Sequence, residues 1–255
     1  MSSILQVRNI EKYFGNKGNV TKAIDDLSFE VEPGEFIGIM GPSGSGKTTL
    51  LNCLSTIDRV TTGDVIINGK KITSLNRRGM EKFRRQELGF IFQDFYLLDT
   101  LTVYENIALA LTIQGVNTSE IQLIVNDITE KLEIKSVLSK FPYEISGGQK
   151  QRVACARAMV TQPTLVFADE PTGALDSKSS RILLESLEKL NQDLNTTILM
   201  VTHDAYTASY TNRILFIKDG KIFNEIVKGT DTQYEFFKCI MEVNTLLGGD
   251  INHVF

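Results

Sequence analysis

Apolar and polar residues alternate over residues 4–8 and 27–31, as they do in strands that bury one face. Asn68-Gly69, a dipeptide typical of hairpin turns, lies between two further strand-like runs. Residues 13–19 are rich in turn formers and hold two adjacent aromatics, so we expect a turn there. The first seventy residues therefore predict a small antiparallel sheet around the strand and helix of residues 36–54.

Longer runs are almost wholly apolar, which is the pattern of strands buried at the centre of a parallel sheet. These runs cover residues 36–40, 88–92, 164–168 and 197–201. A hairpin around Asp219-Gly220 closes the predicted sheet. Elsewhere, apolar residues at helical spacing predict helices. The expected helices cover residues 74–88, 101–113, 119–134, 150–159, 178–194 and 230–247.

The helices after residue 89 interrupt an otherwise regular alternation of strands and helices. We therefore expect a helical subdomain over about residues 89–160. The parts at about 1–88 and 161–228 predict an α/β core with a mixed sheet and an antiparallel β subdomain. Residues from about 229 to 255 predict a C-terminal helical extension. A single domain can hold all these parts, because 255 residues can bury a sizeable core.

Composition and charge narrow the class of protein. The chain is 42% hydrophobic and 23% charged, with a net charge of −4, which argues against nucleic acid as a partner. No apolar run approaches the roughly 18 residues that a transmembrane helix needs, and the first residues lack the pattern of a signal peptide. Cys53, Cys155 and Cys239 are far apart and predict reduced packing residues. We expect a cytoplasmic protein whose membrane role, if any, comes through a partner.

Glycines and hydroxyl residues fill the segment between the apolar run at 36–40 and a helix. They are Gly41, Pro42, Ser43, Gly44, Ser45, Gly46, Lys47, Thr48 and Thr49. This is the P-loop pattern, in which backbone N–H groups and the start of the helix face a polyphosphate. Lys47 would bridge the β- and γ-phosphates, and the Thr48 hydroxyl would hold Mg²⁺. The alternative is a glycine-rich turn that binds nothing, which the complete pattern disfavours.

Two carboxylates, Asp169 and Glu170, follow the apolar run at 164–168. Sheets of this type bind ligands at the carboxyl ends of their strands. Asp169 suits a Mg²⁺ ligand, and Glu170 suits a base or an orienting group for an attacking water. The alternative is that both acids merely start a surface loop, and the P-loop upstream disfavours it.

Three further signals are weaker alone. Gln93 ends an apolar strand, where a glutamine is usually just solvated. Ser146-Gly147-Gly148-Gln149 introduces a helix and could present amides to an anion, although Ser and Gly are also common N-cap residues. His203 follows the strand at 197–201, a position that favours function over a purely structural role. The other histidine, His253, lies in the tail.

Taken in order, these motifs resemble those of the ATP-binding subunits of ABC transporters, and the resemblance covers nearly the whole chain. The matching motifs are the P-loop at 41–49, the Q-loop Gln93, the signature Ser146-Gly147-Gly148-Gln149, the Walker B Asp169 with the catalytic Glu170, the D-loop Ala174-Leu175-Asp176 and the switch His203. The resemblance implies a P-loop NTPase fold of the ABC type and an ATPase that uses ATP and Mg²⁺.

The resemblance also implies a head-to-tail dimer that buries two ATP molecules. Each nucleotide would lie between the P-loop of one chain and the signature, Ser146 to Gln149, of a second copy. Asp176 is expected among the nucleotide-binding residues. The implied Mg²⁺ ligands are Thr48, Gln93 and Asp169. Glu170 would polarise the attacking water and His203 would hold the γ-phosphate, with Lys47 and Gln93 also expected to take part in catalysis.

Members of the family stack an aromatic residue on adenine just before the turn at Gly15. Counting back ten residues from Ile24 selects Phe14, with Tyr13 as the near alternative. The usual residue is Tyr, but stacking needs a π-face rather than a hydroxyl. The signature is preceded by Ile145 instead of the commoner Leu, which is a harmless exchange.

A narrower resemblance, to the bacitracin-resistance transporters of Gram-positive bacteria, rests on residues 55–58, 93–102 and 216–220. It implies an integral-membrane permease as partner, resistance to antimicrobial peptides such as bacitracin or lantibiotics, and signalling to a membrane histidine kinase. The apolar residues after Gln93 would line the groove for the permease's coupling helix. Two alternatives are a lipoprotein-release or macrolide-efflux ATPase, and a soluble ABC ATPase outside transport. A soluble ABC ATPase of that kind would have two nucleotide domains or a long coiled-coil insertion, and the sequence has neither.

Overall fold

The computed structural model describes residues 3–16 and 19–248. The chain divides into two compact units. Unit 1 combines Met1–Leu75 with Leu199–Phe255, and unit 2 is Asn76–Ile198. The boundary falls inside strand β8 (Thr197–Val201). This division into two units does not test the predicted division into core, helical subdomain and extension, which stays a prediction. Residues 249–255 and His253 lie outside the described residues.

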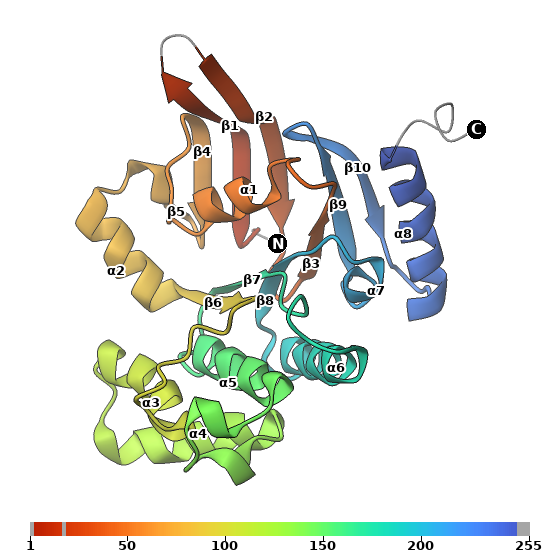
Figure 1. The fold of residues 1–255 in the computed structure, drawn as a ribbon. Coiled ribbons are helices and arrows are strands. Elements are labelled where there is room, and N and C mark those ends of the chain that lie inside the picture. The colour runs from red at the N-terminus through yellow and green to blue at the C-terminus, as the bar shows by residue number, and fades with distance from the viewer. Residues whose placement is uncertain (1–2, 17–18, 249–255) are drawn as a thin grey trace. The chain divides into compact units, whose positions relative to one another are not determined.

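Unit 1 contains the antiparallel sheet that the sequence predicts, with strands in the order β2-β1-β4-β5 (Figure 1). The strands are β1 (Leu5–Asn16), β2 (Asn19–Val31), β4 (Thr62–Ile67) and β5 (Lys70–Lys71). Alternate residues of β1 and β4, such as Leu5, Val7 and Val65, are buried. The period-two pattern in the sequence therefore reflects one covered face of this sheet.

The first two strands are longer than the sequence predicts. Tyr13 pairs with Lys22 and Phe14 with Thr21, so the turn expected over residues 13–19 is wrong for its described residues 13–16 and 19. Residues 17–18 lie outside the described residues. The extension is held by polar contacts, such as the 2.8 Å bond from Lys22 Nζ to Glu11 Oε1. Such charged pairs stabilise strands without giving the apolar alternation that reveals a strand in a sequence.

The remaining strands of unit 1 include β3 (Phe36–Met40), whose five residues are all buried. β3 runs parallel to β9 (Arg213–Lys218), and β9 pairs antiparallel with β10 (Lys221–Val227) across the predicted turn at Asp219-Gly220. Helix α1 (Lys47–Leu54) follows β3, and the short helix α7 (Ala205–Ala208) follows β8.

The last helix, α8 (Gln233–Leu247), packs on the core of unit 1. Phe236 and Ile240 are buried in a cluster with Met40 of β3 and Phe216 of β9. Tyr234, on the same helix, is exposed. The aromatic residues of this helix thus mainly cover their own unit, as the sequence suggests.

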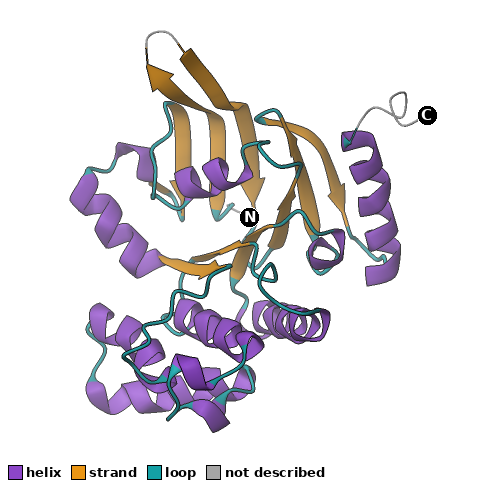
Figure 2. Ribbon diagram, in the orientation of Figure 1, coloured by secondary structure: helices purple, strands orange, loops and turns teal. Residues whose placement is uncertain are grey.

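Unit 2 is mostly helical (Figure 2). Its helices are α2 (Arg77–Glu87), α3 (Val103–Gln114), α4 (Thr118–Lys131), α5 (Gly147–Met159) and α6 (Ser177–Leu194). Two strands, β6 (Leu88–Phe92) and β7 (Leu165–Asp169), pair in parallel. The last residues of the two strands, Phe92 and Asp169, lie opposite each other, so both strands end at one edge.

Helix α5 begins three residues before the start that the apolar spacing predicts. Ser146 Oγ accepts a hydrogen bond from Gln149 N, and Gln149 Oε1 accepts one from Ser146 N at 3.0 Å. This capping box makes Gly147 to Gln149 the first helical turn. Apolar periodicity misses that turn because its residues are glycines and a glutamine.

Within the described ranges, no helix combines the length and apolar character needed to cross a lipid bilayer.

Candidate functional site

The predicted site residues occur in both units, and each group is described by itself. Unit 1 holds the P-loop, the two candidate aromatics and His203. Unit 2 holds Gln93, the signature, the two carboxylates and Asp176.

The P-loop connects β3 to α1 and is fixed by neighbouring backbone. Ser45 N donates to Pro42 O at 3.2 Å, and Gly220 N, in the turn between β9 and β10, donates to Ser45 O at 3.1 Å. Gly46 has φ 102°, a left-handed conformation, and a Cβ there would lie 2.4 Å from Ala23 O of β2. A side chain at Gly46 would therefore force the loop and β2 apart.

The lysine of the P-loop is held against the loop itself. Lys47 Nζ donates to Gly41 O at 2.8 Å and to Pro42 O at 2.9 Å, and the side chain is buried. A polyphosphate on this loop would offer its oxygens to the same ammonium group. Ser45 Oγ is also buried and, among the described residues, has no hydrogen-bond partner.

The start of α1 is open to an anion. Its N-cap residue, Gly46, provides no side-chain cap, and its first turn contains no acidic residue. A Cβ on Gly44 would meet nothing within 4 Å, and Ser43 and Thr48 are exposed. Unsatisfied N–H groups at a helix start favour a negative ligand, so this loop has the features of a phosphate cradle.

The two candidate stacking aromatics occupy different environments on β1. The Tyr13 hydroxyl donates to Glu11 Oε2 at 3.2 Å, and Lys22 Nζ lies 5.3 Å from the centre of its ring. Phe14 is 44% exposed, with Lys12 Nζ 4.8 Å from its ring centre. Each ring thus has a lysine beside it, but Phe14 is exposed, while Tyr13 is only partly exposed and its hydroxyl has a partner.

His203 is exposed and follows β8. Both of its neighbours in sequence are fixed. Thr202 N donates to Ile39 O of β3 at 3.1 Å, and Asp204 caps α7 by accepting bonds from the N–H groups of Tyr206 and Thr207. The bond to Ile39 ties this turn to the strand that leads into the P-loop, so unit 1 brings His203 toward the start of that loop.

In unit 2, the parallel pair β6 and β7 brings Gln93 and the two carboxylates to one edge. Gln93 follows Phe92, whose partner across the pair is Asp169, and Glu170 comes next. Glu170 has φ 45°, and Gly173 N donates to its carbonyl at 2.9 Å. The side chain of Gln93 packs on Gly173, where an added Cβ would lie 2.8 Å from Gln93 Cδ.

The signature lies beside the D-loop. A Cβ on Gly148 would lie 2.8 Å from Ser179 Oγ in α6, so only glycine allows this close approach. Ser146 and Gly147 are exposed. Asp176 caps α6, with Ser179 N donating to it at 2.9 Å and Ser179 Oγ at 2.8 Å. The bond from Ser179 N, followed by that from its hydroxyl, lowers the pKa of Asp176. Asp176 therefore has a structural task as a helix cap.

Sequence reasoning missed three residues that hold the edge around Gln93. Gln151 in α5 is fully buried, and its amide donates to the carbonyl of the last residue of β6 and to that of Pro171, which follows β7. Arg157 donates to the carbonyls of Phe95 and Tyr96, two consecutive residues with positive φ. Burial lowers the pKa of Arg157. Their only sequence signal is a polar residue on a helix face that is otherwise apolar.

The third of these residues is Asn106 in α3, which is 1% exposed. Its side-chain oxygen accepts from Leu98 N at 2.8 Å, and its amide donates to the carbonyls of Leu98, Leu101 and Thr102. These bonds, with those of Arg157, fix the loop that follows Gln93. Tyr96 and Leu98 on this loop remain exposed, at 61% and 47%.

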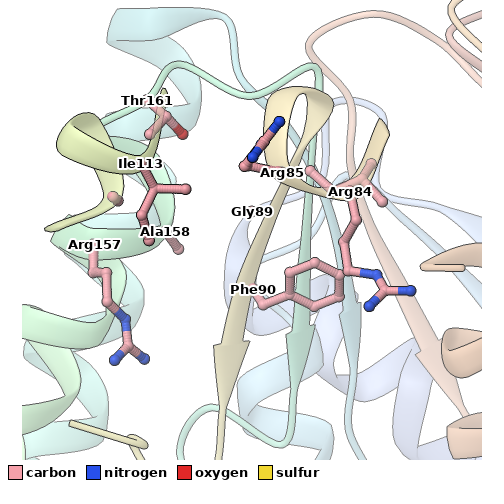
Figure 3. Close-up of a pocket in the computed structure, with 10 residues that line it drawn as sticks. Arg84, Arg85, Gly89, Phe90, Ile113, Arg157, Ala158 and Thr161 are labelled. Atoms are coloured by element: carbon pink, nitrogen blue, oxygen red, sulfur yellow. The ribbon is translucent and has the colours of Figure 1, made fainter. Parts of the chain in front are cut away.

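A pocket of about 230 Å³ lies elsewhere in unit 2 (Figure 3). Its residues are Arg84, Arg85, Leu88, Gly89, Phe90, Ala110, Ile113, Arg157, Ala158 and Thr161. Arg84 and Arg85 line one side, and Ile113, Arg157 and Ala158 line the other. The described lining residues include no acid. The pocket therefore combines an apolar interior with a positive border.

Comparison with known proteins shows the family of the chain. The ABC transporter family model matches residues 24–173. The ABC transporter ATP-binding protein YvcR of Bacillus subtilis is 49% identical, over 98% of this chain and 97% of its own. The bacitracin export ATP-binding protein BceA of Halalkalibacterium halodurans is 48% identical, over 97% of this chain and 98% of its own. The dimeric ATP-binding cassette MJ0796, solved in a post-hydrolysis state with ADP and Pi, is 35% identical with a TM-score of 0.79, covering 88% of this chain and 98% of that chain.

Proposed function

This chain belongs to the ABC transporter family as one of its ATP-binding, ATP-hydrolysing subunits, and from that we propose that it energises a membrane permease for resistance to cell-wall-targeting peptides. The observation that carries the enzymatic part is the open start of α1 behind a buried Lys47. The relative named for bacitracin export supports bacitracin as the cargo, and we include lantibiotics in the same proposed class. The permease would hold the chain at the cytoplasmic face of the membrane, and could also relay a signal to a histidine kinase.

We assign the binding roles first. The backbone N–H groups of residues 41–49, apart from Pro42, which has none, hold the phosphates together with Lys47, and Phe14, rather than Tyr13, stacks on adenine. A lysine lies over each of the two rings, but Phe14 is favoured because it is 44% exposed, while Tyr13 is only partly exposed and its hydroxyl donates to Glu11. Nucleotide binding by this loop follows from backbone N–H groups and one cation, and requires no movement of β3.

The hydrolytic roles go to other side chains. Glu170 orients and polarises the attacking water, and His203 holds the γ-phosphate. Thr48, Gln93 and Asp169 offer the hydroxyl, amide and carboxylate oxygens that Mg²⁺ prefers. Bound there, Mg²⁺ would neutralise charge on the β- and γ-phosphates. The exposed Ser146 and Gly147 and the neighbouring Gly148 and Gln149 would close over the nucleotide of a second copy, with Asp176 beside them.

The permease is proposed to dock on unit 2. Helix α2 carries five basic and two acidic residues in a chain whose net charge is −4. Its Arg85 is exposed at the border of the pocket, and Ile113 is exposed on the other side. An amphipathic segment that inserts an apolar side chain and presents a carboxylate to the arginines fits this pocket. The exposed Tyr96 and Leu98 after Gln93 would extend the same contact surface.

The enzymatic proposal is tested with Glu170→Gln in the purified protein. We expect ATP binding to persist, a dimer to accumulate in ATP, and hydrolysis to fall by at least about 100-fold, because the general base is lost. Size-exclusion chromatography and phosphate release measure the two effects. Brisk turnover by Glu170→Gln would remove Glu170 from this role.

The partner is tested by co-expression with the permease of a neighbouring reading frame. We expect Arg85→Glu to reduce copurification of the permease by at least about tenfold, because charge reversal opposes an acidic segment. Arg78→Glu, on the same helix but away from the pocket, is the matched control. Equal capture by both variants would exclude the pocket, and a four-span permease of the lipoprotein-release type would replace the peptide-resistance assignment.

A further inference from the structure

The side chain of Gln151 joins three parts of unit 2. Its Nε2 donates to Phe92 O at 3.0 Å and to Pro171 O at 2.8 Å, and the residue is 0% exposed. Gln151 itself lies in α5, the helix that begins with the signature. One amide nitrogen thus links that helix to the ends of both β6 and β7.

Each of the two carbonyls is next to a residue of the proposed site. Phe92 immediately precedes Gln93, and Pro171 immediately follows Glu170. The two chain segments are already in register, with Phe92 opposite Asp169. The amide therefore fixes the backbone at the points where Gln93 and Glu170 leave their strands.

The backbone at Glu170 requires such support. A glutamate with φ 45° is in the left-handed region, which non-glycine residues adopt only when surrounding contacts hold them. Gly173 N holds the carbonyl of Glu170 at 2.9 Å, and Gln151 holds the carbonyl of Pro171. Loss of either bond would let Glu170 relax toward an ordinary conformation and redirect its carboxylate.

We propose that Gln151 is a positioning residue for ATP hydrolysis, which fixes Gln93 and Glu170 relative to the signature end of α5. The proposal rests on the roles proposed above for Gln93 and Glu170. Closure of a second copy onto the signature would be transmitted through α5 and this amide to both strand ends. Gln151 touches no nucleotide in this scheme and acts through backbone alone.

The chemistry of the side chain agrees with this role. A primary amide carries two N–H groups on one nitrogen, so it can donate to two carbonyls at once. Gln151 Oε1 is buried and, within the described part of the chain, accepts no hydrogen bond. Because all the bonding is through Nε2, a side chain of equal length without N–H groups would lose both links.

The test is Gln151→Met, which keeps the length of the side chain and removes both donors. We expect kcat to fall by about 10- to 100-fold, as for misplacement of a catalytic group by about 1 Å. The KM for ATP should stay within about twofold, because the P-loop residues are unchanged. Steady-state hydrolysis over a range of ATP concentrations gives both constants.

Asn191→Leu is the matched control in the same unit. Asn191 is also buried, and its Nδ2 donates to Thr196 O at 2.7 Å, between α6 and β8. This variant loses a buried amide-to-carbonyl bond of the same kind away from the site, so kcat should change by less than about twofold. Thermal unfolding of both variants shows whether their losses of stability are comparable.

Equal kcat values for Gln151→Met and the native chain, or equal falls in both variants, would overturn the proposal. If Gln151→Met does not fold, Gln151→Asn, whose shorter side chain cannot reach both carbonyls, replaces it with the same expected split between kcat and KM. In the double variant Gln93→Ala/Gln151→Met, kcat should fall by less than the product of the two single falls. The reason is that Gln151 acts partly by positioning Gln93, which the double variant lacks. Turnover that survives in Glu170→Gln would instead remove Glu170 from the proposed catalytic role on which this inference rests.

Discussion

Two helices of this protein, α1 and α5, begin with glycine-rich turns but satisfy their first N–H groups differently. α1 begins after Gly46, with no side-chain cap and no acid in its first turn. α5 begins after Ser146, whose hydroxyl and backbone N–H both bond to Gln149. The start of α1 thus leaves its donors for a ligand, while α5 caps itself.

This difference suits the two helices to different steps, with α1 for nucleotide binding and α5 for turnover. A helix start with unpaired donors gains most from an anion, so α1 is suited to hold the nucleotide in a single chain. The capping box of α5 engages Ser146 N and Gln149 N, and we propose that Gly147 and Gly148 contact nucleotide only when a second copy closes. Nucleotide affinity should therefore depend on unit 1, and turnover should respond to the start of α5.

The largest effect on ATP affinity is expected from Lys47→Ala, beside the start of α1. A hydrogen bond to a charged group contributes about 1.5–3 kcal/mol, so ATP affinity should fall by about 10- to 100-fold. Equilibrium binding of ATP to the isolated chain measures the effect. Lys150→Ala, at the fourth residue of α5, is the control and should leave affinity within about twofold. Similar losses in both variants would contradict the assignment of nucleotide binding to α1.

A smaller effect is expected from Phe14→Ala. Loss of an aromatic contact worth about 0.5–1.5 kcal/mol should raise the KM for ATP by roughly two- to tenfold. Tyr13→Ala should change the KM less, because Tyr13 is less exposed than Phe14 and its hydroxyl donates to Glu11. Phe14→Tyr should keep the native KM. A larger rise in Tyr13→Ala than in Phe14→Ala would reverse the assignment.

The smallest effect on nucleotide affinity is expected from Ser146→Ala. Loss of the cap should reduce the free energy of unfolding by about 1 kcal/mol, leave ATP affinity unchanged and lower turnover at saturating ATP. Thr232→Ala removes a matching capping box from α8 and should cost similar stability without loss of turnover. Chemical denaturation and phosphate release measure the two effects. Weaker ATP binding by Ser146→Ala would show that α5 contributes to the first binding step.

Much of the fold could be predicted because its signals are local. The five residues of β3 and the first four of β7 are buried, as their continuous apolar runs indicate, and the hairpin turn at Asn68-Gly69 follows from its two residues. The predictions failed where polar contacts extend an element. Lys22 and Glu11 lengthen the first hairpin, and Ser146 and Gln149 start α5 earlier than its apolar residues do.

The candidate site residues were chosen from the sequence and stay predictions, whereas the contacts that support them appear only in the structure. Glycine spacing and strand-end carboxylates indicate the P-loop and the pair Asp169 and Glu170, because those residue types directly perform the chemistry. The supporting contacts of Gln151 and Arg157 are not visible in sequence, because their partners are backbone carbonyls, which every residue has. Nothing in the residue types at Phe92 or Pro171 indicates a bond to Gln151.

The sequence by itself determined the family and predicted the phosphate-binding loop, because the motifs that indicate them are formed by neighbouring residues. Only the tertiary structure decided that Phe14 is more accessible than Tyr13, that Asp176 caps a helix, and that Glu170 has a left-handed backbone. These features depend on contacts between residues distant in the chain, such as the 59 residues that separate Gln151 from Phe92. The local sequence pattern determines whether a segment forms a helix, a strand or a turn, and tertiary packing determines which groups each side chain contacts.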